Sequence, residues 1–402
     1  MLTDTSQKQH QENSFSRLAW KAGAATLCNL VLNTARRFAY PFAPALSRGL
    51  GVHLTAVTSL IAINQATSII GIFFGPLADR FGYRLMMIAG LEMLVVGMLA
   101  GGFLPFYSVI LLAFFLAGLA KTLFDPALRA YIGERVPFQK RGLVIGLLEF
   151  SWAGSALVGI PGIALLIDRF GWRSPFFVLG GLGIFSILTL LILIPRDIRR
   201  TNAHQDSPSV LSDLSQLVQQ RAPLGTLGFV LLFDIANDNL FVVYGAWLEQ
   251  SFSLSIVVLG VGTSIIGAAE LLGESLTASF ADRLGLKRSI IIGIILSLLC
   301  YVILPFSSQT LPFAFISLFV LFLIFEFTIV SSLSLSTELL PTSRATMMSG
   351  FFAAAGLGRV IGSLIGSHIW LAGGILATGL VSGVICVAAL ISLVWGLQGR
   401  LR

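Results

Sequence analysis

Residues 75–84 read GPLADRFGYR, and a shortened copy of this stretch, DRLGLK, occupies residues 282–287. The Asp-Arg pair that the two stretches share recurs after 203 residues in a chain of 402. A second pair of similar stretches, ERVP at 134–137 and ELLP at 338–341, recurs after 204 residues. Two matches at nearly the same separation indicate that the chain consists of two duplicated halves.

The composition restricts the class of protein. Of all residues 56% are hydrophobic and 11% are charged, and the mean hydropathy is +0.90. A soluble chain of this size could not bury so much apolar surface and still present a polar exterior. These values exclude soluble enzymes, disordered chains and nucleic-acid-binding proteins, although the net charge of +7 alone would suit the last class. The three cysteines lie in apolar stretches, as expected of packed residues rather than of disulfides or metal ligands.

Apolar stretches long enough to cross a membrane recur throughout the chain. A transmembrane helix needs about 20 mostly apolar residues, and the sequence predicts an all-α polytopic membrane protein with twelve such helices. The predicted spans are 20–45, 56–77, 86–104, 108–132, 143–167, 175–195, 224–248, 254–280, 289–307, 311–337, 346–371 and 373–397.

The one long polar interruption divides these spans into six and six. We therefore expect two pseudo-symmetric six-helix bundles, 20–195 and 224–402, joined by a cytoplasmic central loop, 196–223. Residues 1–19 are rich in Gln and Ser and lack the apolar segment of a signal peptide, so we expect a disordered cytoplasmic N-terminus.

The Lys and Arg residues predict the orientation. With an even number of helices both termini lie on one side, and the loops of that side carry eighteen Lys and Arg residues. The opposite loops carry three: Arg48, Arg169 and Arg173. Cytoplasmic loops are the ones enriched in these residues, so both termini are predicted to be cytoplasmic, in a protein of the cell membrane. This asymmetry also accounts for the basic net charge.

The stretch at 75–84 resembles the loop signature of the major facilitator superfamily, Gly-x-Leu-Ala-Asp-Arg-x-Gly-Arg-Lys, and lies between the predicted second and third helices, as in that family. The second copy is weaker, with Ala278 in place of the first Gly. The resemblance covers essentially the whole chain. It implies a transporter whose two halves rock against each other, with a central cavity lined by helices 1, 4, 7 and 10.

Within the superfamily the chain resembles the sugar and drug efflux permeases. The residues Gly159-Ile160-Pro161-Gly162 partly match the helix-five motif of drug exporters, whereas Phe114 stands where their helix four carries Arg. This resemblance slightly favours export.

The intramembrane charges follow a period of three helices. Helices 1, 4, 7 and 10 hold eight charged residues, helices 2, 5, 8 and 11 hold four, and helices 3, 6, 9 and 12 hold one, Glu92. A charge in hydrocarbon costs several kcal/mol, so charged residues must face protein or water. We therefore expect every third helix to line an aqueous cavity and every third helix to face lipid.

The candidate substrate-binding residues are intramembrane charged residues of helices 1, 4, 7 and 10: Arg37, Lys121, Asp234, Asp238 and Glu326. The first half contributes mostly basic groups and the second half mostly acidic groups, which favours a zwitterion or another molecule with separated charges. Two alternatives stay open. Lys121 shares a helix face with Asp125 and could simply form a salt bridge. Arg36 and Arg37 are about 100° apart on a helix, so at most one is expected to point directly into the cavity, and we favour Arg37 slightly.

Ion coupling requires acids whose charge can change inside the membrane. Asp234 and Asp238 share one face of helix seven, and two close carboxylates cannot both ionise cheaply, so one is expected to bind a proton. The alternative is that Asn237, Asn239 and basic residues satisfy both as fixed anions. Glu326, alone among apolar residues, and the pair Glu270 and Glu274 on helix eight are the further coupling candidates.

The predicted gating residues lie toward the cytoplasmic ends of the helices. They are Asp79, Arg80, Arg84, Asp125, Arg129, Asp282 and Arg283. We expect Asp79 and Asp282, at equivalent loops, to bridge the halves in the outward-facing state. Arg359, among glycines on helix eleven, is expected to form a structural ion pair, which could join it to an acid of the other half.

The sequence therefore predicts a secondary active transporter for a small organic solute, driven by a proton gradient, with export slightly favoured. The four histidines lack metal-ligand spacing and no phosphate-binding loop is present, so we expect no cofactor, no metal and no enzymatic activity. The alternatives are an uptake symporter or uniporter, a protein that translocates lipids or amphiphiles, and a membrane sensor without flux. We expect a monomer in the lipid bilayer.

Overall fold

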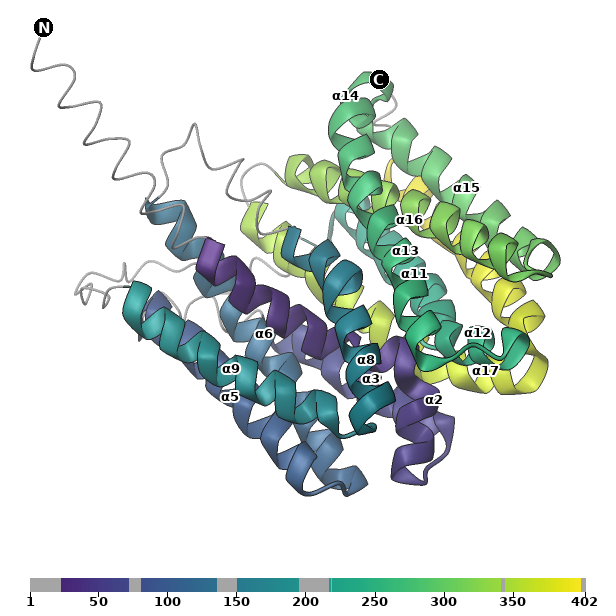
Figure 1. The fold of residues 1–402 in the computed structure, drawn as a ribbon. Coiled ribbons are helices and arrows are strands. Elements are labelled where there is room, and N and C mark those ends of the chain that lie inside the picture. Colours follow the sequence, from purple (N-terminus) through teal and green to yellow (C-terminus); the bar gives the residue numbers. More distant parts are fainter. Residues whose placement is uncertain are drawn as a thin grey trace, which may run out of the picture.

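The computed structural model describes residues 23–71, 81–135, 150–194, 217, 219–340 and 344–398. Within these ranges the regular secondary structure is helical and includes no strand. Figure 1 shows the helices, coloured along the sequence.

The first half of the chain forms the helices that were predicted as spans one to six. They are a helix over 23–37, α2 (Ala39–Leu50), α3 (Leu54–Ile70), α5 (Tyr83–Phe103), α6 (Tyr107–Arg135), a helix over 150–154 that continues through a π-helical turn, η2 (Ser155–Gly159), into α8 (Ile160–Phe170), and α9 (Ser174–Leu193).

The second half repeats this series. Its helices are α11 (Arg221–Phe241), α12 (Tyr244–Phe252), α13 (Ile256–Leu276), the π-helical turn η3 (Thr277–Ala281), α14 (Asp282–Leu284), α15 (Leu286–Ser307), α16 (Leu311–Leu339) and α17 (Arg344–Gly396).

Nine helices of the described chain are long and apolar enough to cross a membrane. One of them, α17, has 53 residues and contains two predicted spans, 346–371 and 373–397. Its backbone leaves the helical conformation at Gly373 and Gly374, where the boundary was expected, and Gly374 has a φ of 61° that few other residues adopt. The described part of each predicted span is largely helical. Spans 20–45 and 56–77 are not among the nine helices, and the last two spans are counted as one helix.

Two glycines show that the halves are structurally equivalent where the sequence repeats. Gly82 precedes α5 with a φ of 96°, and Gly285, its counterpart 203 residues later, precedes α15 with a φ of 83°. Both positions lie in the left-handed region that favours glycine. The repeated Asp-Arg-x-Gly stretch therefore specifies the same turn into a membrane helix in each half.

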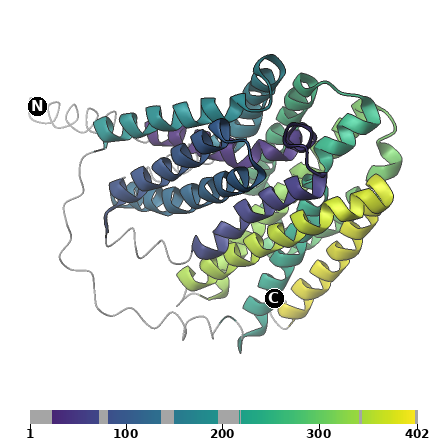
Figure 2. The ribbon, with the colours of Figure 1, turned by 90° about the horizontal axis from the view of Figure 1, so that it is seen from below.

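The two halves meet along three helix pairs. In Figure 1 the helices before residue 194 gather on the left and those after 221 mostly on the right. At the junction α3 packs against α17, α8 against α13, and α2 against α12. Figure 2 shows α3 running alongside the first part of α17 in the rotated view. The predicted boundaries of the bundles fall largely outside the described residues, so this division remains a prediction.

One boundary differs from the sequence prediction. Arg221–Pro223 were assigned to the central loop, but α11 begins at Arg221. Pro223 is compatible with this start because the first backbone N–H groups of a helix have no intrahelical partner.

The predicted lipid-facing helices carry exposed apolar side chains, as do parts of α6, α8, α13 and α16. On α9, Phe185 is 67% exposed and Ile192 81% exposed, and on α15 Ile303 and Phe306 are likewise exposed. Such faces suit a hydrocarbon environment and not water.

Candidate functional site

A cavity of about 290 Å³ lies between the two halves. Its lining comes from the helix over 23–37, α2, α3, α6, the segment at 151–152, α11, α13, α16 and the first part of α17. These are the predicted helices 1, 2, 4, 5, 7, 8, 10 and 11. Among the described residues helices 3, 6, 9 and 12 contribute nothing to the lining, as expected of lipid-facing helices, whereas helices 2, 5, 8 and 11 line the cavity together with helices 1, 4, 7 and 10.

Contacts between the halves close one end of the cavity. Arg48 on α2 donates to Glu249 on α12, with 2.6 Å between Nη1 and Oε1. Thr58 and Ser367 share a hydrogen bond of 2.9 Å between α3 and α17. The lining extends away from these contacts, toward Arg129 on α6. The positive-inside pattern predicts that the closed end faces outward.

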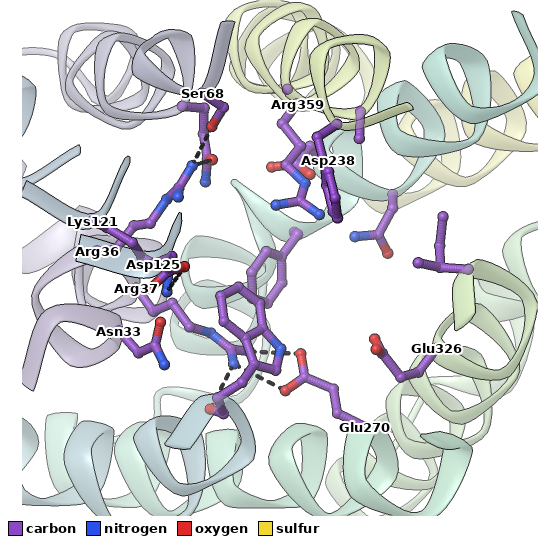
Figure 3. Close-up of a pocket in the computed structure, with 18 of the residues that line it drawn as sticks. Asn33, Arg36, Arg37, Ser68, Lys121, Asp125, Asp238, Glu270, Glu326 and Arg359 are labelled. Carbon is purple, nitrogen blue, oxygen red and sulfur yellow. Dashed lines mark hydrogen bonds and ion pairs between the residues drawn. The ribbon is translucent and has the colours of Figure 1, made fainter. Parts of the chain in front are cut away.

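Arg37 and Glu270 form a buried ion pair between the halves (Figure 3). Arg37 donates to both carboxylate oxygens, at 2.7 and 3.0 Å, and the side chains are 4% and 6% exposed. The Arg37 guanidinium also lies 4.3 Å from the ring centroid of Trp152. Arg37, a predicted substrate contact, and Glu270, a predicted coupling acid, therefore neutralise each other's charge.

Lys121 and Asp125 form the salt bridge that their spacing allowed, with 2.6 Å between Nζ and Oδ2. Lys121 also donates to Asn29 at 3.3 Å. Both partners line the cavity, as does Arg129, one turn further along α6. Lys121 and Asp125 are thus placed at the cavity but engaged with each other.

Asp234 is placed away from the cavity lining. Its Oδ1 accepts a hydrogen bond of 3.0 Å from Nε of Arg359, and its side chain is 1% exposed. Asp234 does not appear among the cavity-lining residues of the described chain. α17 packs against this face of α11 and supplies the cation that neutralises Asp234, so the expected role of Asp234 as a substrate contact stays a prediction. Arg359 thus forms an ion pair with an acid, as expected, but within the second half and not across the halves.

Asp238, in contrast, lines the cavity and bonds to the other half. Its Oδ1 accepts hydrogen bonds from Tyr40 at 2.9 Å and from Ser363 at 3.4 Å. Tyr40 in turn accepts a hydrogen bond from Gln65 at 2.7 Å, and Gln65 accepts one from Arg36. A chain of neutral side chains therefore connects a cation of the first half to an acid of the second.

Glu326 lies on α16 at the side of the cavity opposite Arg36 and Arg37 (Figure 3). It is half-buried and has neither a hydrogen bond nor an ion pair with the described residues. Glu274, the remaining coupling candidate, also lines the cavity from α13.

Arg36 is the arginine that the sequence analysis favoured less than Arg37 for pointing into the cavity. It lines the cavity, is 7% exposed, and donates to Gln65 and, at 2.8 Å, to Ser68. Its Nε has no hydrogen-bond partner in the part of the chain that the structure describes. Arg37 was favoured over it, but both arginines line the cavity, and Arg37 is the one engaged with a carboxylate.

Most predicted gating contacts cannot be compared with the structure. Asp79 and Arg80 lie outside the described residues, and the side chain of Asp282 is not described. Arg84 donates to the backbone oxygen of Leu191 at 2.7 Å within the first half, and Arg283 is exposed.

Sequence reasoning missed the uncharged polar residues of the site. Tyr40, Gln65, Ser68 and Trp152 all line the cavity. A census of Gln, Asn and Tyr within the predicted spans, alongside the charged residues, could have identified Gln65 and Tyr40.

The geometry agrees with the comparisons with known proteins. The family model described as Major Facilitator Superfamily matches residues 25–233 and, again, 226–400. The chain belongs to this superfamily. The repeated match spans both halves, and membership identifies the protein as a membrane transporter.

Similar proteins extend the comparison. The MFS-type transporter YwfA of Bacillus subtilis is 24% identical over 358 residues, 86% of this chain and 84% of YwfA. YceJ of the same organism is 25% identical over 299 residues, 74% of this chain and 75% of YceJ. The multidrug resistance protein MdtG of Salmonella arizonae is 26% identical over 244 residues, 60% of this chain and 59% of MdtG.

Solved structures share the fold. A bacterial homologue of the human lysosomal transporter Spinster aligns with a TM-score of 0.72 at 14% identity, over 94% of this chain and 95% of that one. The nucleoside transporter NupG aligns with a TM-score of 0.76 at 14% identity, over 94% and 98%.

Proposed function

We propose that this transporter of the cell membrane moves a small organic solute by alternating access and couples this movement to protons. The observation that carries the proposal is the distribution of ion pairs in the cavity. Glu270 and Asp234 each form an ion pair with an arginine, whereas Asp238 and Glu326 form no ion pair among the described residues; Arg359 acts on both of them only from a longer distance. Acids without a fixed counter-charge can change their charge during a cycle, as coupling to an ion gradient requires.

Asp238 links proton binding to the contact between the halves. An ionised Asp238 accepts hydrogen bonds from Tyr40 and Ser363. A proton on this carboxylate weakens its attraction for the Tyr40 hydroxyl, which belongs to the other half. Proton binding would therefore bias the opening of the closed end, because a ligand shifts an equilibrium by its differential affinity for the two states.

The arrangement of the cavity supports a state that is open toward the cytoplasm. The ends of α2 and α12 meet at Arg48 and Glu249, on the side that the charge asymmetry predicts to be external. Transport then proceeds by rocking the two halves about the cavity. Both termini are cytoplasmic in this proposal, and the transporter acts as a monomer.

The direction we favour is export by proton antiport. The partial similarity to the multidrug resistance protein MdtG supports this direction. In the simplest antiport mechanism the proton and the substrate compete for the same carboxylate, and Glu326 is the cavity acid best placed for this competition because its oxygens are not engaged by described residues.

Reconstitution in vesicles tests this function. Solutes that raise the melting temperature of the purified protein in a metabolite and drug screen are first selected, because a ligand stabilises the state it binds. We expect flux of such a solute to follow an imposed pH gradient. Flux toward the acidic side supports export by antiport, and flux away from it indicates symport. Flux that does not depend on the gradient would indicate a uniporter, translocation of lipids would indicate a lipid transporter, and binding without flux would indicate a sensor. Each of these results would contradict the proposal.

A further inference from the structure

We propose that the substrates are zwitterions with well-separated charges, whose anionic group binds Arg36 and whose cationic group replaces the proton at Glu326. This inference rests on the proposed antiport and deepens it by assigning a substrate class to the cavity.

Arg36 has the properties of a vacant anion site. Its side chain is buried, its Nη2 bonds to the neutral partners Gln65 and Ser68, and its Nε has no partner among the described residues. Within the described residues Arg36 forms no ion pair with a carboxylate, whereas Arg37, Lys121 and Arg359 each do.

Such an arrangement is costly without an anion. Removing a cation from water carries a penalty of several kcal/mol that a geometrically suitable anion offsets. An unsatisfied buried N–H donor adds to this penalty. A carboxylate or phosphate of a bound molecule would supply the counter-charge and accept the Nε hydrogen bond, since arginine binds such groups through two adjacent N–H groups.

Glu326 offers the complementary site across the cavity (Figure 3). The charged groups that act on it are Glu270 and Glu274 on α13, Arg37 on the first helix and Arg359 on α17. Arg37 and Arg359 are committed to other carboxylates. A substrate ammonium can therefore provide the positive partner that Glu326 lacks, with release of the proton it replaces.

Together, Arg36 and Glu326 favour a substrate that carries both an anionic and a cationic group. A purely cationic substrate would leave Arg36 without an anion, and a purely anionic substrate would leave Glu326 without a cation. Because the two residues lie on opposite sides of the cavity, the charges must be separated by a spacer. The rings of Phe241, Phe322 and Phe325 line the cavity and favour an apolar, aromatic spacer.

A series of four probes of nearly equal shape separates the charge requirements. Para-aminoethylbenzoate carries both charges, para-aminoethylbenzamide is cationic, para-propylbenzoate is anionic, and para-propylbenzamide is neutral. Their affinities for the purified protein are measured by calorimetry at one pH, without a gradient. We expect the zwitterion to bind at least about tenfold more tightly than either singly charged probe, the effect of one charge-assisted contact.

Two variants assign the charges to residues. Arg36→Gln is expected to abolish the preference for the zwitterion over the cationic probe. Glu326→Gln is expected to abolish the preference for the zwitterion over the anionic probe. The matched controls Arg288→Gln and Glu92→Gln, at exposed positions outside the cavity, should keep the wild-type order of affinities.

The wild-type series decides the question even if a variant fails to fold. Equal affinity for the zwitterion and the cation, equal affinity for the zwitterion and the anion, or no binding of any probe would overturn the substrate class. The proposed function would survive these results if another solute still followed the pH gradient in vesicles.

Discussion

At the scale of single residues, local spacing predicted some contacts and not others. Lys121 and Asp125 are four residues apart on one helix, so their salt bridge could be predicted. Arg37 and Glu270 are 233 residues apart, and their ion pair depends on how α13 packs against the first helix. For the same reason the sequence could not decide between Arg36 and Arg37, because the carboxylate that engages one of them lies in the other half.

The Arg37–Glu270 pair leads to a stability prediction. Glu270→Gln leaves the buried Arg37 guanidinium without its counter-charge, and loss of one partner of a buried pair costs about 3–5 kcal/mol. We expect a loss of this size in the free energy of unfolding, measured by denaturant titration in detergent micelles.

The control is the exposed pair of the outer end. Glu249→Gln removes the partner of Arg48, whose side chain is 59% exposed, and should change the unfolding free energy by less than about 1 kcal/mol. A Glu270→Gln variant as stable as Glu249→Gln would show that the buried pair does not stabilise this state.

At the scale of helices, the apolar runs predicted where the membrane helices lie and the distribution of charges predicted which of them line the cavity. The sequence could not show how the helices close one end, because this depends on shape. Gly245 on α12 is an example: a Cβ atom at this position would overlap the carbonyl oxygen of Pro41 on α2. The glycine permits the close approach of the two halves at that end.

Gly245→Val should therefore open the closed end. Overpacking typically costs about 1–3 kcal/mol, and this cost falls on the closed state alone. A population shift of about tenfold or more is expected. It is measured as faster reaction of a single cysteine at Tyr244, which is 1% exposed in this state, with a membrane-impermeant thiol reagent in a background without the native cysteines.

The matched variant is Gly162→Val on α8, where an added Cβ would meet no atom of the described residues within 4 Å. Its labelling rate should equal that of the parent. Equal rates for Gly245→Val and the parent would disprove the role of this glycine in closure.

At the scale of the whole molecule, the asymmetry of Lys and Arg predicts the orientation. Gln220, before α11, is predicted to lie in the cytoplasm, and Gln309, between α15 and α16, outside the cell; both are exposed. Single cysteines at these positions should react with an impermeant reagent from opposite sides of the membrane. Reaction from the same side would contradict both the orientation and the number of helices between them.

The central claim is that protons drive transport through Asp238 and Glu326, the cavity acids that form no ion pair with the described residues. Its most direct measurement is solute accumulation in vesicles under an imposed pH gradient, for wild type, the Asp238→Asn/Glu326→Gln double variant and the Glu92→Gln control. Wild type and control should accumulate solute in proportion to the gradient, whereas the flux of the double variant should no longer respond to it. Gradient-driven accumulation by the double variant at the wild-type level would contradict the claim and direct attention to Glu274 or to the ion-paired acids Asp234 and Glu270.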